Sequence, residues 1–355
     1  MLFTSLEYLL FLPATLILYW TLPHRFRVPM LLIASYLFYM SWNSTLVLLI
    51  IAMTVFNYFL GDVLSRATSH KKLVFGIGIV ANLACLSYFK YSNFFVNSAN
   101  GLLHLVGAPT YSVTLNIILP LGISFFVFEF IHYLFDIYRG SKPLKSFALF
   151  GLFAAFFPTQ IAGPIKRYDD FSAQMVEEKK LKLEYFDEGV PLIIIGLAKK
   201  ILIANNLAIL VDMMANTISS YGALELWIFS FAFSFQVYFD FSGYTDIARG
   251  SSILFGYRIP INFNLPFIAA NTSDLWNRWH ISLSHWLRDY LFRPLGGTKR
   301  NRLTVDRALI LTMTLGGLWH GASWNFVIWG LYFGLCLAIH RNFKRLKPKM
   351  PALSG

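Results

Sequence analysis

The sequence predicts an all-α, polytopic integral membrane protein. Of its 355 residues, 56% are hydrophobic and only 14% are charged, whereas soluble domains carry roughly 25% charged residues. The apolar residues are gathered into runs that are separated by short polar loops, many of them basic. Together these observations predict about 9–11 transmembrane or re-entrant helices.

The first run, residues 2–21, is predicted to be a retained membrane helix, because it has Glu7 near its start, no basic n-region and no small-residue cleavage site. The later runs are residues 28–40, 45–60, 73–90, 115–137, 147–163, 190–215, 225–247, 308–320 and 322–340. Several fall short of the roughly 20 residues that a straight span needs, which predicts re-entrant or paired half-spans. The last two runs predict two short helices joined near His320 and Gly321.

Loop charges predict the orientation in the membrane. Basic residues occur in three loops, 22–27, 61–72 and 138–146, whereas the alternate loops, 41–44 and 91–114, contain no Lys or Arg. The positive-inside rule therefore places the basic loops in the cytoplasm and the N-terminus outside. Lys90, at the end of the fourth run, is the exception, and its long side chain can snorkel to the interface.

The net charge of +12 is interpreted in this membrane context: basic loops fix topology and meet anionic lipid head groups, and no nucleic-acid partner is expected. The basic segments 164–188 and 293–307 are expected in the cytoplasm, the first as a short amphipathic or loop element. Cys85 and Cys336 lie in apolar spans without metal-ligand spacing, so neither a disulfide framework nor a metal site is expected. No internal repeat is visible, which predicts a single membrane domain over residues 1–355.

Two polar groups interrupt the apolar pattern in the middle of the chain. Glu129, His132, Asp136 and Arg139 share one helix face; they either form a polar wall facing a cavity or a self-paired network that joins helices, and the second is favoured for Glu129 and Arg139. Downstream, Asp246 precedes Arg249 by three positions, so a local ion pair explains it. Asp240 has no such neighbour and is therefore a candidate functional carboxylate.

Residues 271–290 predict one amphipathic helix capped at Asn271, Thr272 or Ser273. On a helical wheel, an aromatic face borders a polar stripe made of Asn277, His280, Ser284 and Arg288. His285 lies about 140° from His280 on this wheel, so the two cannot jointly bind a metal ion from one face. The alternative interpretation is an interfacial helix anchored by tryptophans.

His320 lies in a stretch, residues 308–339, without Lys, Arg, Asp or Glu. An ionisable group at membrane depth indicates function; the alternative is a neutral histidine hydrogen-bonded between packed helices. The neighbouring Gly316, Gly317 and Gly321 allow close backbone approach. The sequence has no GxSxG, Walker A, GxGxxG or HxxxxD pattern, so an enzyme would use histidine as a base without a serine or cysteine nucleophile.

Residues 276–290 (WNRWHISLSHWLRDY) and 319–324 (WHGASW) closely resemble the membrane-bound O-acyltransferase family. The resemblance extends over most of the chain: residues 1–43, 121–139, 156–165 and 239–246. Within the family it is most similar to the bacterial alginate O-acetylation branch, and the branch that exports D-alanine to teichoic acids is a near relative. Members usually continue beyond this length, so the sequence is expected to be either a fragment or a natural short form that lacks helices at the C-terminus.

The resemblance implies a polytopic helical fold around a central tunnel, with His320 as the catalytic residue and His280 as the second histidine. Supporting roles are expected for Asn277, Arg278 and Trp319, with Asp240 as a weaker candidate that orients an imidazole. The implied reaction moves an acetyl group from acetyl-CoA or another cytoplasmic acyl thioester to an exported polysaccharide. It implies no bound cofactor or metal, a bacterial inner-membrane location, and an extracytoplasmic acetyltransferase or polysaccharide-modification partner.

Three alternatives remain. One is D-alanyl transfer or export to teichoic acid. Another is a transporter or channel that uses the polar residues as a relay, although no paired inverted halves are visible. The last is a scaffold of a polysaccharide-export complex, against which the presence of both histidines counts.

Overall fold

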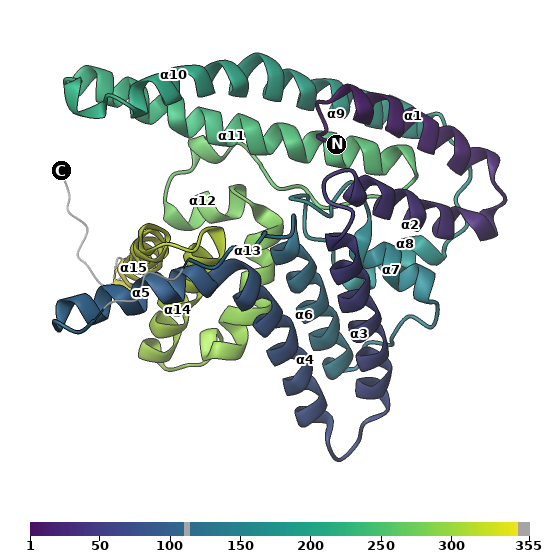
Figure 1. Cartoon of the computed structure of the whole chain (residues 1–355), viewed down its shortest axis with the longest axis horizontal. Coiled ribbons are helices and arrows are strands. Elements are labelled where there is room, and N and C mark those ends of the chain that lie inside the picture. The colour runs from purple at the N-terminus through teal and green to yellow at the C-terminus, as the bar shows by residue number, and fades with distance from the viewer. Residues whose placement is uncertain (110–113, 347–355) are drawn as a thin grey trace. The chain divides into compact units, whose positions relative to one another are not determined.

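The computed structural model describes residues 1–109 and 114–346, and helices make up nearly all of the regular structure there (Figure 1). No β-strand forms among these residues; an isolated bridge joins Phe263 and Trp279. Four helical stretches are long and apolar enough to cross a membrane: Leu46–Arg66, Lys71–Leu105, Glu184–Ala215 and Trp324–Leu346. The predicted all-α polytopic fold is confirmed, whereas the central tunnel and the single-domain organisation stay predictions.

The described chain divides into two compact units. Unit 1 consists of Met1–Val74 and Phe128–Asn262, and unit 2 consists of Phe75–Val127 with the described part of the chain from Phe263 onward. Two helices, α4 (Lys71–Leu86) and α6 (Ile123–Arg139), run from one unit into the other.

Unit 1 is built around buried aromatic side chains. Its first three helices are α1 (Leu6–Thr21), α2 (His24–Met40) and α3 (Leu46–Arg66), and the apolar helix α7 (Phe147–Ala155) packs against α2 and α3. Phe150 and Phe153 of α7 are completely buried. The short helix α8 (Tyr168–Val176) packs on α7. This cluster buries the aromatic surface that stabilises the unit.

Unit 1 also contains a long helical hairpin (Figure 1). One arm is a continuous helical stretch composed of α9 (Glu184–Ala198), the π-helical turn η2 (Lys199–Ala204) and α10 (Asn205–Ala215). After the 3-10 turn η3 (Ile218–Ser220), the other arm, α11 (Ala223–Leu254), returns along all three.

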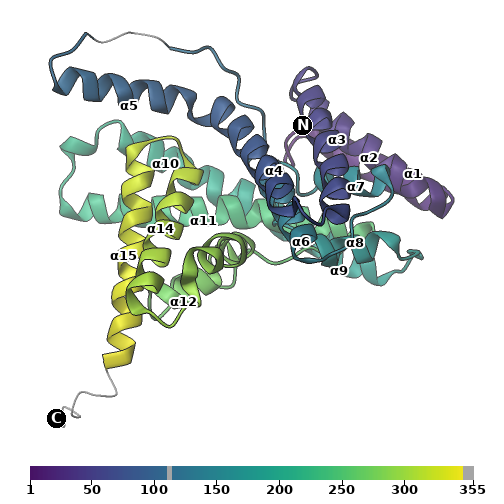
Figure 2. The same cartoon turned by 90° about the horizontal axis from the view of Figure 1, so that it is seen from below.

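Unit 2 contains the end of α4, the π-helical turn η1 (Ser87–Tyr91), α5 (Ser92–Leu105) and a series of helices after the 3-10 turn η4 (Pro266–Ile268). These are α12 (Thr272–Arg278), α13 (Ile281–Leu287), the π-helical stretch η5 (Arg288–Gly297), α14 (Arg302–His320) and α15 (Trp324–Leu346). Figure 2 shows α14 and α15 side by side as an antiparallel pair.

Glycines allow α14 and α15 to approach each other closely. A Cβ atom built on Gly330 would lie only 3.0 Å from the Cα atom of Gly317 and 2.9 Å from that of Thr314. The backbones are therefore in direct contact at this crossing, as small residues permit between membrane helices. The predicted junction of two helices near His320 and Gly321 is confirmed, but the helices are not short: α14 has 19 residues and α15 has 23.

One predicted loop is wrong. Residues 91–114 were assigned to a loop because they lie between the apolar runs 73–90 and 115–137, but residues 92–105 form helix α5, continuous with α4 through η1. The polar residues mixed into this segment do not interrupt the helix, and residues 92–105 contain no proline. Residues 110–113 of the same predicted loop lie outside the described residues.

Candidate active site

His320 is the last residue of α14, at the end of the hairpin that lies farthest from its basic residues. Arg302 and Arg307 are near the start of α14, and Arg341, Lys344 and Arg345 are near the end of α15. At the usual helical rise, about 20 Å of helix separates His320 from Arg307. If the basic ends are cytoplasmic, this length carries the histidine deep into or across the hydrocarbon region.

His280 occupies a sharp break between α12 and α13. Its backbone is left-handed, with φ 43° and ψ 54°, a region that side-chain-bearing residues seldom adopt. On the N-terminal side of the break, Trp279 bridges to Phe263, and the Asn264 N–H donates to the Arg278 carbonyl at 2.9 Å. Backbone strain of this kind, of order 1–3 kcal/mol, persists where the surroundings fix it and often marks functional positions.

The break brings the two predicted histidines together. The ring centroids of His280 and His320 are 6.4 Å apart, and the Trp319 ring lies 4.9 Å from His320 and 6.1 Å from His280. Trp329 of α15 adds another aromatic ring 5.3 Å from His320. His280 is buried, with 2% of its surface exposed, whereas His320 is exposed. The candidate site therefore pairs an exposed histidine with a buried one, and the Trp319 and Trp329 rings lie beside His320.

Two residues at η1 hold the end of α14. The Lys90 ammonium donates to the carbonyl of Trp319 and to Ser124 Oγ at 3.2 Å, and the Tyr91 hydroxyl donates to the carbonyl of Leu318 at 3.1 Å. The last carbonyls of a helix have no partner within the helix, so these bonds cap it and fix the backbone that carries His320. The prediction that Lys90 snorkels to the interface is replaced by this contact. The sequence feature that could have indicated this buried contact is a lysine at the end of an apolar run.

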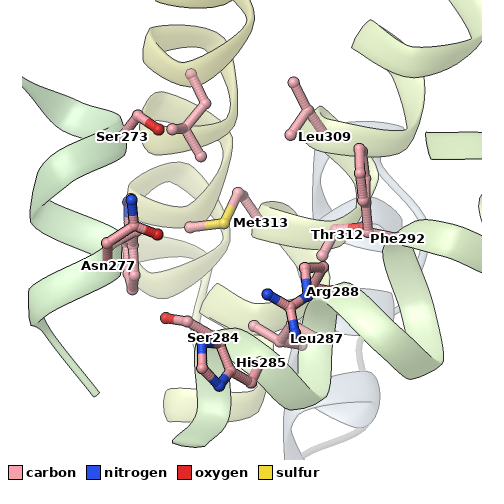
Figure 3. Close-up of a pocket in the computed structure, with 12 residues that line it drawn as sticks. Ser273, Asn277, Ser284, His285, Leu287, Arg288, Phe292, Leu309, Thr312 and Met313 are labelled. Atoms are coloured by element: carbon pink, nitrogen blue, oxygen red, sulfur yellow. The ribbon is translucent and has the colours of Figure 1, made fainter. Parts of the chain in front are cut away.

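A cavity of about 230 Å³ lies between α12, α13, η5, α14 and α15 (Figure 3). Its polar lining includes Asn277, Ser284, His285, Arg288 and Thr312. The prediction of one continuous helix over 271–290 is wrong, because the left-handed residue at His280 separates α12 from α13. His285 of α13 lines this cavity together with Asn277 and Arg288, whereas His280 is not among the lining residues. The predicted separation of His285 from His280 stays a prediction.

The other supporting residues of unit 2 have structural contacts. Arg278 pairs with Asp274 at 2.8 Å and donates to the Asn264 carbonyl at 3.3 Å. That hydrogen bond from Arg278 lowers the pKa of Asp274. The Trp319 ring receives the Lys90 ammonium at 5.4 Å and packs edge-on against Phe125 at 5.5 Å. Both residues thus shape the ends of the helices that carry the histidines.

Asp240 and Asp246 lie on α11 in unit 1, where each has a lysine partner from η2. Asp240 pairs with Lys200, and Asp246 accepts a hydrogen bond from Lys199 at 2.6 Å. The predicted pair between Asp246 and Arg249 is present but longer, at 4.0 Å. The sequence analysis looked for partners only among nearby residues and missed both lysines. Lys200 is 40 positions from Asp240, and Lys199 is 47 positions from Asp246. The role of Asp240 beside an imidazole stays a prediction.

Unit 1 also buries an ion pair that the sequence did not reveal. Lys166 Nζ lies 2.6 Å from Glu129 Oε1 and 2.6 Å from Thr159 Oγ1, and only 1% of Lys166 and 5% of Glu129 is exposed. A structural pair was predicted for Glu129, but within its own helix. Lys166 was assigned to a charged cytoplasmic segment; it is instead buried, because Glu129 and Thr159 compensate its charge.

Comparisons with known proteins identify the family of this chain. The family model of the membrane-bound O-acyltransferases (MBOAT) matches residues 34–353. The protein named probable alginate O-acetylase AlgI of Azotobacter vinelandii is 44% identical over 97% of this chain and 69% of its own length. The peptidoglycan O-acetyltransferase of Helicobacter pylori is 37% identical over 98% of this chain and 71% of its own length.

The chain belongs to the membrane-bound O-acyltransferase family. The predicted class, a membrane-bound O-acyltransferase that acts on an exported polymer, is confirmed at that level by the family match and the named relatives. A teichoic acid D-alanyltransferase of Streptococcus thermophilus is a more distant relative, 32% identical over 67% of this chain and 61% of its own length. The lipid bilayer is likewise the environment of this family and of the apolar helices described above.

Proposed function

We propose that this MBOAT protein transfers an acetyl group from a cytoplasmic acyl thioester to a hydroxyl group of an exported, alginate-like polysaccharide. The observation that carries the proposal is the pair of His320 and His280, 6.4 Å apart at the end of the α14–α15 hairpin. The exposed His320 is placed to reach a substrate, and the buried His280 lies next to it.

In the proposed reaction, His320 acts as the general base. Its neutral imidazole removes the proton of the acceptor hydroxyl as the oxygen attacks the thioester carbonyl. A C–O bond forms, the tetrahedral intermediate collapses with cleavage of the C–S bond, and the proton passes from His320 to the departing sulfur. Such a base typically contributes about 10²–10⁴-fold to the rate.

His280 has a different proposed role, because it is buried and held by a strained backbone. A fixed imidazole at this place suits donation of a hydrogen bond to the developing oxyanion, or orientation of the thioester. Preorganised donors in a dry site contribute about 3–4 kcal/mol to transition-state stabilisation. The hydrogen bonds from Lys90 and Tyr91 to the last carbonyls of α14 fix the position of His320 relative to His280.

The donor is proposed to enter through the cavity lined by Asn277, His285 and Arg288. Thr312 and Met313, which also line it, lie about two helical turns before His320, toward the basic end of α14. Arg288 suits the negative charges of a phosphorylated thioester such as acetyl-CoA. The thioester is a substrate, so the proposed reaction uses no bound cofactor.

The proposed setting is the bacterial inner membrane, with an extracytoplasmic acetyltransferase or polysaccharide-modification protein as partner. D-alanyl transfer to teichoic acid is the second candidate, but the relative with that name is less similar and matches a smaller part of the chain. Membership of an acyltransferase family argues against a transporter or a scaffold.

Oriented membrane vesicles from the native host, loaded with deacetylated alginate, test the proposal. [¹⁴C]Acetyl-CoA added outside inside-out vesicles reaches the cytoplasmic face, and we expect labelled polymer in the lumen. Right-side-out vesicles given the same donor should remain unlabelled, as should inside-out vesicles with His320→Gln. Equal labelling in both orientations, or labelling that survives deletion of this gene, would contradict the proposal.

A further inference from the structure

A second cavity of unit 2, of about 740 Å³, lies at the turn that follows His320. One wall is a single face of η1 and α5, on which Lys90, Asn93, Asn97 and Ser98 follow one another at helical spacing. The opposite wall is formed by residues 322–324, which include Ser323 and Trp324. Its volume is in the range of small-molecule sites in proteins.

Several of the lining groups hold the walls in place. The Asn93 side chain donates to the Leu115 carbonyl at 3.0 Å and accepts from the Leu115 N–H at 2.9 Å. Trp324 Nε1 donates to Ser98 Oγ at 3.2 Å, and the Trp324 ring packs against Phe94 at 5.6 Å. These bonds tie α5 to the turn after His320, so the cavity is built into the hairpin end.

Lys90 gives this cavity a positive charge. Two of its three ammonium donors are used by the Trp319 carbonyl and by Ser124 Oγ, which leaves one donor. Among the described residues, no carboxylate lies within ion-pair distance of Lys90, in contrast to Lys166, Lys199 and Lys200. A half-buried ammonium without an acidic partner favours an anionic ligand.

The residues that line the two cavities lie on opposite sides of His320 along the chain. The cavity proposed for the donor includes Leu309, Thr312 and Met313, which precede His320 on α14, whereas the Lys90 cavity includes Ala322, Ser323 and Trp324, which follow it. The Lys90 cavity is also at the end of the hairpin away from the basic residues. This is where an acceptor arriving from outside would meet an acyl group arriving from the cytoplasm.

We propose that the Lys90 cavity is the acceptor site, and that it selects a hydroxyl-bearing acceptor with a carboxylate or phosphate group that pairs with Lys90. The exposed amide of Asn97 and the Ser323 hydroxyl supply further polar contacts, and Trp324 supplies a flat aromatic wall. This inference rests on the proposed acyl transfer, because it assigns one of the two substrates of that reaction.

Protection of a single cysteine tests acceptor binding without measuring catalysis. In the full chain in membranes, Cys85 and Cys336 are replaced by alanine and Ser98→Cys is introduced, so that one thiol lies in the cavity. The rate at which this thiol reacts with a membrane-impermeant maleimide is measured first without any added oligomer. It is then measured with a hexamer of uronate residues, with oligomeric glycerol phosphate or with a neutral hexose hexamer. We expect at least one of the two anionic oligomers to slow labelling about fivefold, and the neutral hexamer to have no effect.

Variants in the same background test whether the positive charge of Lys90 is responsible for the protection. Lys90→Arg should keep the protection and Lys90→Gln should abolish it. Asn97→Asp, which leaves Lys90 and its bonds intact, should weaken it by placing a negative charge in the cavity. Comparing protection by the uronate hexamer with protection by oligomeric glycerol phosphate distinguishes a carboxylate preference from a phosphate preference. Equal protection in the Lys90→Gln protein, or no protection by either anion, would overturn the proposal.

A final variant separates this inference from the proposed reaction. His320→Gln should keep the protection, because it removes the base and not the binding cavity. If the wild-type protein shows Lys90-dependent protection but no acetyl transfer, the proposed function fails while the anion site stands. If transfer occurs without Lys90-dependent protection, the anion site fails while the proposed function stands.

Discussion

His280 lies 6.4 Å from His320 between ring centroids, and it does so with a left-handed backbone at φ 43°. The two facts are connected, because the break at His280 turns α13 away from α12 and leaves this imidazole against Trp319, next to His320. A continuous helix would carry residues 281–290 in another direction. The strained position is therefore part of how the candidate site is assembled.

His280→Asn tests whether the imidazole matters beyond the backbone it requires. Asparagine tolerates the left-handed conformation better than most residues, so we expect a folded, membrane-inserted protein. Acetyl transfer should fall at least tenfold, because the amide does not reproduce the imidazole. Transfer is measured per amount of inserted protein, and wild-type transfer by His280→Asn would show that His280 serves the backbone alone.

The buried pair of Lys166 and Glu129 predicts a large loss of stability when one partner is removed. Lys166→Met leaves Glu129 without its partner, and breaking such a pair costs about 3–5 kcal/mol. Adding Glu129→Leu should restore part of this loss, because the double variant leaves no unpaired charge. The measurement is the thermal unfolding of the detergent-solubilised protein.

The exposed pair between Asp62 and Arg66 is the matched control for this cycle. Asp62→Asn should change stability by less than about 1 kcal/mol, as exposed pairs generally do. If Lys166→Met is as mild as Asp62→Asn, the Lys166 charge is not buried as described.

The glycine contact between α14 and α15 predicts a steric penalty. Gly330→Ala places a methyl group 3.0 Å from Gly317 Cα, so the helices must separate, at a cost of about 1–3 kcal/mol. Because α14 carries His320, acetyl transfer should fall as well. Gly76→Ala is the control, since a Cβ there meets nothing within 4 Å and alanine favours the helix by about 0.5–1 kcal/mol. Equal stability of the two variants would contradict the close crossing.

Much of the fold could be predicted from composition and periodicity. The low charge content predicted a polytopic helical protein, and the apolar runs around His320 predicted the α14–α15 hairpin. Helix α5 was missed, because residues 91–114 lie between two apolar runs and were assigned to a loop. Residues 92–105 mix polar and aromatic side chains, so the search for continuous apolar runs did not identify them as a helix.

The site was predictable in its residues but not in its geometry. Both histidines were identified from motifs, yet the helical wheel assumed a continuous helix through His280, where the structure has a left-handed break between α12 and α13. The contacts of Lys90 with Trp319 and of Lys166 with Glu129 join positions far apart in the chain. Such pairings depend on the tertiary fold, and no spacing in the sequence encodes them.

His320 is proposed to act as a general base and not as a polar group that only fills space between helices. The most direct measurement is acetyl transferred to exported polymer in cells that carry His320→Gln, normalised to membrane-inserted protein. Glutamine can donate and accept hydrogen bonds but cannot take up the proton, so we expect transfer to fall at least ~10²-fold. Transfer within about threefold of wild type, far less than a general base contributes, would contradict a catalytic His320.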